Sequence, residues 1–134
     1  MVRPPQETST IEDEVIKNGL HVPRSVSRVI MADKTCRFFT LKEYVRALKR
    51  VRKGTYQSEI YDCDDFARYA VSSVKSDPHR PKLHGAAIGV TFGRYSPYRE
   101  YHAIVVFWTA PDKRYYWEPQ THTIVKFHPD QIFL

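Results

Sequence analysis

The chain has 134 residues, a length that predicts a single domain (1–134) with one hydrophobic core. Hydrophobic residues make up 42% of the chain and aromatic residues 13%, which favours a globular fold over a disordered one. The net charge of +6 is compatible with acidic partners, among them nucleic acid and anionic cell-wall polymers.

Cysteine content and hydropathy indicate where the protein resides. The two cysteines, Cys36 and Cys63, exclude a framework of disulfides, and their reduced thiols favour the cytoplasm. No apolar run is long enough to span a bilayer, and residues 1–10 lack the apolar segment of a signal peptide. We therefore expect a soluble cytoplasmic protein with no membrane partner, and we interpret Cys36 as a structural residue.

The first half of the chain predicts helices. Residues 1–7 are expected to be a flexible tail, and residues 9–20 a short helix that ends near Gly19. A clearer helix is expected over residues 40–54, because Thr40 and Glu43 form a capping box ahead of an apolar stripe. Another helix should begin near Cys63, where apolar residues continue at helical spacing up to Val74.

The second half of the chain predicts strands. Apolar residues alternate within residues 86–93, and residues 101–108 are rich in β-branched and aromatic side chains. A turn over 110–113 is followed by expected strands at 114–119 and 121–127. Helices followed by an antiparallel sheet predict an α+β fold with N-terminal helices, in which the Cys63 helix packs on the sheet.

The segment YDCDDFA places a cysteine among three acids at the start of a helix. Asp62 is a natural N-cap, and Asp64 and Asp65 fall in the first turn, where the helix dipole favours anions. The same N-terminus favours a thiolate, whereas the carboxylates oppose one. Cys63 is therefore either a nucleophile, which needs a nearby imidazolium, or a small core residue.

His102 and Glu118 are the candidate partners of Cys63. His102 begins a core strand, and Glu118 lies on the next strand, so the order is cysteine, histidine, acid. Gln57 could share an oxyanion hole with the backbone N–H of Cys63. A turn centred near Asp112 would place His102 about 10–13 Å from Glu118 along the strand.

The geometry of this hairpin therefore does not determine which residue orients the His102 ring. A bulge, or a turn centred closer to Ala110, would bring Glu118 to His102. In the absence of either, Gln120 or His122 would orient the ring instead.

These motifs resemble the papain-like and transglutaminase-like cysteine hydrolase superfamily. DCDDFA, YHAIVVFW and WEPQT together also resemble the protease-like domain of a mushroom agglutinin and of related small phage-borne proteins, over residues 40–128. The resemblance implies Cys63 as nucleophile, His102 as general base and Glu118 as orienting acid. Tyr101 departs from it, because a glycine usually precedes the histidine and a tyrosine there would crowd a substrate cleft.

The agglutinin resemblance also implies calcium. The oxygen ligands would be Asp62, Asp64 and Asp65, although capping and solvation explain these residues better than metal binding does. The other histidines lack the spacing of a zinc site.

The predicted function is that of a small cysteine hydrolase, or a related acyl transferase, acting on a protein or peptide substrate. The alternative is a catalytically inactive papain-like binding module, phage-encoded and acting on a host protein. Nucleic-acid binding is disfavoured, because basic and aromatic residues are not arranged as a stacking platform.

Overall fold

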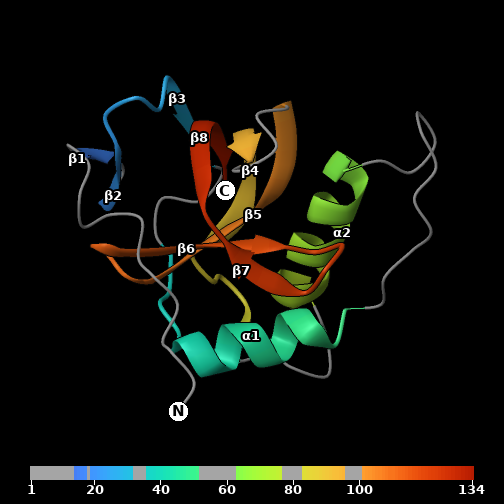
Figure 1. Cartoon of the computed structure of the whole chain (residues 1–134). Coiled ribbons are helices and arrows are strands. Elements are labelled where there is room, and N and C mark those ends of the chain that lie inside the picture. Colours follow the sequence, from blue (N-terminus) through green and yellow to red (C-terminus); the bar gives the residue numbers. More distant parts are fainter. Residues whose placement is uncertain (1–13, 18, 32–35, 52–62, 77–82, 96–100) are drawn as a thin grey trace, which may run out of the picture.

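A computed structural model describes residues 14–17, 19–31, 36–51, 63–76, 83–95 and 101–134. Its main element is a six-stranded sheet in the order β3-β8-β4-β5-β6-β7 (Figure 1). All neighbouring strands in this sheet are antiparallel except β3 and β8, which are parallel. The strands are β3 (Arg28–Ile30), β4 (Ile88–Tyr95), β5 (Tyr101–Ala110), β6 (Lys113–Glu118), β7 (Thr123–Val125) and β8 (Phe127–Phe133).

The described residues form two helices, α1 (Leu41–Lys49) and α2 (Cys63–Ser76) (Figure 1). The predicted capping box is confirmed, because the Thr40 hydroxyl accepts from the Glu43 N–H while the Glu43 carboxylate accepts from the Thr40 N–H. Helix α2 packs against β4 and β5 and touches α1. The two helices thus bury one face of the sheet in a core that includes Tyr44, Ala70 and Phe107.

A short hairpin covers part of the other face of the sheet. Strands β1 (Glu14–Lys17) and β2 (Leu20–Pro23) pair antiparallel, and Leu20 and Val22 pack in a second core with Ile104, Val106 and Trp108. Because side chains alternate along a strand, β5 supplies alternate residues to both cores. The sheet therefore lies between the helices on one side and the hairpin on the other.

Buried Arg114 ties the hairpin to the sheet. Its side chain is 0% exposed, and it donates from Nε to the Tyr116 hydroxyl at 2.6 Å and from Nη1 to the His21 carbonyl at 2.9 Å. The Glu14 carboxylate lies 3.5 Å from Nη1. A buried guanidinium is tolerated where such partners replace its hydration, so the contact joins β6 to both strands of the hairpin.

The predicted α+β papain-like fold with N-terminal helices is wrong. Strands predominate among the described residues, the sheet is mixed, and the chain begins with β1, β2 and β3. Glu14–Lys17 and Leu20–Pro23 are strands where a helix was expected over 9–20. The pairing of Lys17 with Leu20 leaves a two-residue loop, and Gly19 has a φ of 79° there. An Asn-Gly pair is a strong hairpin signal, and it outweighed the acidic first turn.

The last strand, β8, was not predicted either, although it lies inside the sheet between β3 and β4. Pro129 cannot donate to a strand ladder, so the FHPDQIF segment does not look like a central strand. The register of β4 and β8 shifts between Phe92 and Gly93, and Pro129 pairs with Gly93 at this irregularity. The bulge therefore accommodates the proline.

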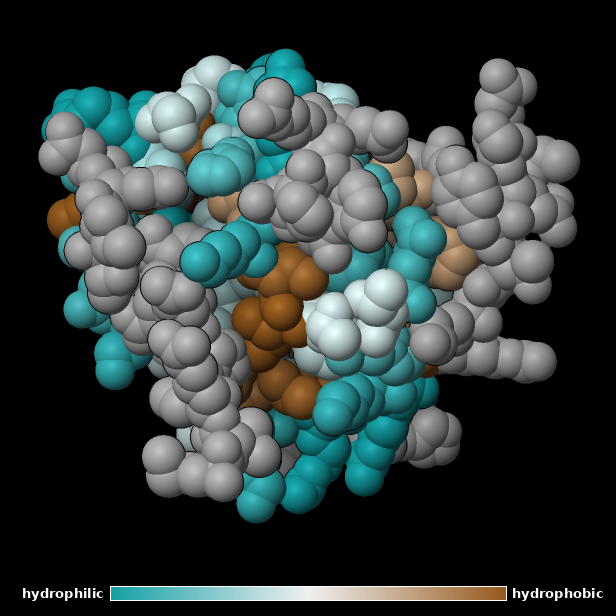
Figure 2. Space-filling view, in the orientation of Figure 1, coloured by the Kyte–Doolittle hydropathy of each residue, from teal (hydrophilic) through white to brown (hydrophobic). Residues whose placement is uncertain are grey.

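The described residues contain no helix that is long and apolar enough to cross a bilayer. On the face shown in Figure 2, hydrophobic side chains gather in one central area that hydrophilic side chains border.

Candidate functional site

His102 and Glu118 meet because a bulge sets the register of β5 and β6. Trp108 pairs with Arg114, but Ala110 pairs with Lys113, so one residue of β5 is extra. Beyond the bulge Val105 pairs with Trp117, and one more step sets Ile104 opposite Glu118. His102 and Glu118 are then diagonal neighbours on the same face. Without the extra residue, the Glu118 side chain would point to the opposite face.

The Glu118 carboxylate is buried and held at both oxygens. Oε2 lies 2.8 Å from Nε2 of His102, and Oε1 accepts from the backbone N–H of Gln120 at 2.9 Å. The Glu118 side chain is only 5% exposed. A buried carboxylate with two such partners has a fixed orientation, so it also fixes the plane of the His102 ring.

Cys63 is the first residue of α2, and its half-buried side chain is hydrogen-bonded to His102. This bond and the one to Glu118 raise the pKa of His102 from 6.5 to about 9, against the lowering effect of burial. The nearby charges of Glu118 and Cys63 raise the pKa further. The ring is therefore protonated at neutral pH and places a positive charge between a thiol and a carboxylate.

Part of the predicted site lies outside the described residues. Gln57 and Asp62 belong to an undescribed segment, and the side chain of Asp64 is also undescribed. Asp65 is half-buried in the first turn of α2. Among the described side chains, no group of three or more His, Cys, Asp or Glu residues could hold a metal ion. The calcium site and the oxyanion role of Gln57 stay predictions.

The other residues considered for orienting His102 have different surroundings. Gln120 bonds to Glu118 through its backbone N–H. The His122 ring lies against Trp117, with 5.8 Å between ring centroids. Tyr101, expected to crowd a cleft, is 56% exposed, and its hydroxyl lies 3.5 Å from a carboxylate oxygen of Asp130. The carboxylate at the ring of His102 is thus that of Glu118.

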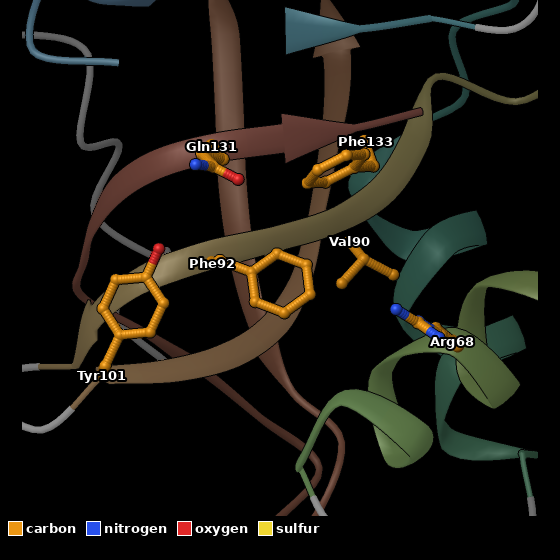
Figure 3. Close-up of a pocket in the computed structure, with 6 residues that line it drawn as sticks. All are labelled: Arg68, Val90, Phe92, Tyr101, Gln131 and Phe133. Atoms are coloured by element: carbon orange, nitrogen blue, oxygen red, sulfur yellow. The ribbon is translucent and has the colours of Figure 1, made fainter. Parts of the chain in front are cut away.

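A pocket beside this site was not predicted from the sequence. It has a volume of about 360 Å³ and lies between α2 and the β8-β4-β5 part of the sheet (Figure 3). Its lining residues are Arg68, Val90, Phe92, Tyr101, Gln131 and Phe133. The alternation of apolar residues in β4 predicted a buried face, but the pairing of β4 with β8 that completes the pocket left no signal in the sequence.

Comparison with known proteins identifies several similar solved structures, including two with TM-scores above 0.6. No family model matches the chain, and no curated protein matches it. One similar structure is described as a PSL1a-E64 complex, with a TM-score of 0.66 and 18% identity over 84% of this chain. The other is Polyporus squamosus lectin bound to the human-type influenza-binding epitope Neu5Acα2-6Galβ1-4GlcNAc, with a TM-score of 0.63 and 18% identity over 82% of this chain.

These likenesses concern the fold. The chain spans less than half of each matched structure, 45% and 44% of their lengths. The resemblance to a mushroom agglutinin agrees with them at this level, whereas neither comparison supports a papain-like superfamily. The predicted function, a cysteine hydrolase or acyl transferase, is corrected by the same finding, because the similar structures are those of a glycan-binding lectin.

Proposed function

We propose that this chain is a ligand-binding domain whose reactive group is the thiol of Cys63. The observation that carries the proposal is the place of His102, whose ring is hydrogen-bonded to both Cys63 and the buried Glu118. A histidine ring that contacts a cysteine sulfur and is oriented by a carboxylate is the arrangement that activates a nucleophilic thiol. Glu118 is a positioning residue, because it acts on the sulfur only through His102.

The proposed chemistry is the capture of an electrophilic ligand. The Cys63 sulfur supplies the electron pair for a new bond to an electrophilic carbon, and the bond from that carbon to its leaving atom breaks. The leaving atom keeps the electron pair of the broken bond, and His102 can donate its proton to that atom. The similar fungal protein PSL1a was solved in complex with E64, which makes E64 the first ligand to test.

The experiment compares the alkylation rates of the two cysteines by iodoacetamide at pH 7. Burial raises the pKa of Cys36, so this thiol is the internal reference for a slow reaction. We expect Cys63 to react about tenfold faster or more, as measured by peptide mass mapping over time. His102→Ala should remove this advantage, whereas His128→Ala, at an exposed position of β8, should keep it. Equal rates for the two cysteines, or a fast Cys63 in His102→Ala, would contradict the proposal.

E64 tests whether the reactive thiol also binds a ligand. We expect one equivalent of E64 to protect Cys63 from iodoacetamide and to leave the alkylation of Cys36 unchanged. Absence of protection at saturating E64 would separate thiol reactivity from ligand binding and would reject E64 as a ligand.

A second candidate function is glycan binding, which the sialylated epitope of the similar lectin favours. The net charge of +6 suits an anionic sugar. Saturation-transfer NMR with Neu5Acα2-6Galβ1-4GlcNAc should then show transfer to the sialic acid, and the neutral Galβ1-4GlcNAc should show less. Equal or absent transfer for the two glycans would reject this function.

A further inference from the structure

The pocket between α2 and β8 combines an apolar interior with a few polar groups at its rim. Figure 3 shows the Phe92 ring between Tyr101 on one side and Val90 on the other. Phe92 and Phe133 meet edge to face, with 5.6 Å between ring centroids and 85° between ring planes. Such an arrangement offers ring faces and edges to a further aromatic group.

The polar groups of the pocket lining belong to Arg68, Gln131 and Tyr101, whose hydroxyl is directed to Asp130. Arg68 is an exposed residue of α2, and its guanidinium is directed toward Val90 in Figure 3. The amide of Gln131 lies on the opposite wall, on β8. An arginine at the rim of an apolar pocket is suited to a carboxylate, because its planar fork matches the two carboxylate oxygens.

The size of the pocket limits the ligand. A volume of about 360 Å³ is near the lower end of the range for small-molecule sites, roughly 300–1,000 Å³. Mostly apolar walls favour a hydrocarbon ring over a sugar, whose hydroxyl groups would lack partners there. The net charge of the chain, +6, also favours an anion.

We infer that this pocket binds a small aromatic carboxylate, with its ring against Phe92 and Phe133 and its carboxylate at Arg68. The site is separate from the Cys63 thiol and needs no reaction with it. It adds a reversible, non-covalent ligand site to the domain.

The experiment is an NMR titration of ¹⁵N-labelled protein with 4-phenylbutyrate and with 4-phenylbutan-1-ol, its neutral counterpart. We expect saturable shifts of the Val90, Phe92 and Phe133 amides with both compounds. The carboxylate should bind roughly threefold to tenfold more tightly than the alcohol at low salt. Shifts that do not saturate, or that spread over the surface and spare these amides, would overturn the inference.

Variants separate the two parts of the site. Arg68→Gln should remove the preference for the carboxylate, whereas the matched control Arg46→Gln, at an exposed position of α1, should retain it. Phe133→Leu should weaken the binding of both compounds. The chemical shifts of amides far from the pocket report whether the variant keeps its fold. A carboxylate preference that survives Arg68→Gln would exclude Arg68 as the anion-binding group and would overturn the proposed assignment.

Alkylation of Cys63 provides a separate readout for the thiol. The rate at which iodoacetamide alkylates Cys63 should not change in Arg68→Gln. If the pocket binds neither compound, the proposed function of Cys63 is therefore unaffected. If the pocket binds 4-phenylbutyrate but Cys63 is alkylated no faster than Cys36, only the proposal for the Cys63 thiol would be rejected.

Discussion

His102 and Glu118 are joined diagonally across two strands, with 2.8 Å between Nε2 of the ring and Oε2 of the carboxylate. Neither residue is opposite the other in the ladder, because the bulge between Trp108 and Ala110 sets the register. The contact between the ring and the carboxylate thus depends on a bulge that lies more than about 10 Å from His102 along β5, at roughly 3.4 Å per residue.

Glu118→Gln should lower the pKa of His102 from about 9 by at least about 1 unit, because it removes a negative charge and keeps the shape of the acceptor. The measurement is an NMR titration of the His102 ring protons. Glu43→Gln, on α1, is the control and should leave the His102 pKa unchanged. An unchanged His102 pKa in Glu118→Gln would show that Glu118 contributes no charge effect to the ring.

Protonation of His102 should make folding stability depend on pH. The folded-state pKa, about 9, is above the ordinary value of 6.5, so the folded protein binds this proton more tightly. The resulting stability is complete below pH 6.5 and is lost as pH rises through 9, by about 3 kcal/mol in total. Urea unfolding of the wild type and His102→Asn at pH 6 and pH 9.5 measures the difference. Parallel pH profiles for the two proteins would contradict the raised pKa.

Arg114→Met should destabilise the protein by about 2–4 kcal/mol, because it removes the donor to the buried Tyr116 hydroxyl, one of the two donors to the His21 carbonyl and the cation beside Glu14. Amide exchange of Leu20 and Val22 should accelerate more than that of β5, because the hairpin loses its tie to β6. Lys113→Met, an exposed change on the same strand, is the control. Equal exchange of the hairpin in both variants would mean that packing alone holds it.

Gly93→Ala should destabilise the protein by about 3 kcal/mol or more, because an added Cβ would lie 2.1 Å from the backbone oxygen of His128. The bulged pairing of β4 with β8 would have to open. Gly19→Ala makes the same change where nothing lies within 4 Å of the new atom, and its φ of 79° predicts a cost of about 1 kcal/mol. Chemical denaturation ranks the two variants, and an equal cost for both would refute the steric explanation.

Local patterns predicted the elements that local interactions stabilise. The capping box of Thr40 and Glu43 marked the start of α1, and helical spacing from Cys63 marked α2. The β-branched and aromatic run of β5 likewise reported a strand buried on both faces. In each case neighbours within a few residues determine the outcome, so one segment of sequence is sufficient.

Long-range pairing could not be predicted in the same way. β8 enters the sheet between β3 and β4, and Pro129 hides its character as a strand. A bulge of one residue determines whether Glu118 lies on the same face of the sheet as His102. The residues near Thr109 carry no sequence signal that predicts this bulge. The pocket draws on α2, β4, β5 and β8, so it exists only once these pairings are formed. The predicted fold class was wrong for the same reason, because a fold class depends on how distant strands pair.

One backbone oxygen links the hairpin to the rest of the molecule. The His21 carbonyl accepts from the indole N–H of Trp108 at 3.1 Å and from the Arg114 guanidinium at 2.9 Å. A fragment that starts after β2 would lose this acceptor and would expose Ile104 and Val106, which Leu20 and Val22 cover in the intact chain. The smallest fragment able to fold independently therefore includes β2, and trimming at this end should stop before residue 14 if Glu14 is to be retained.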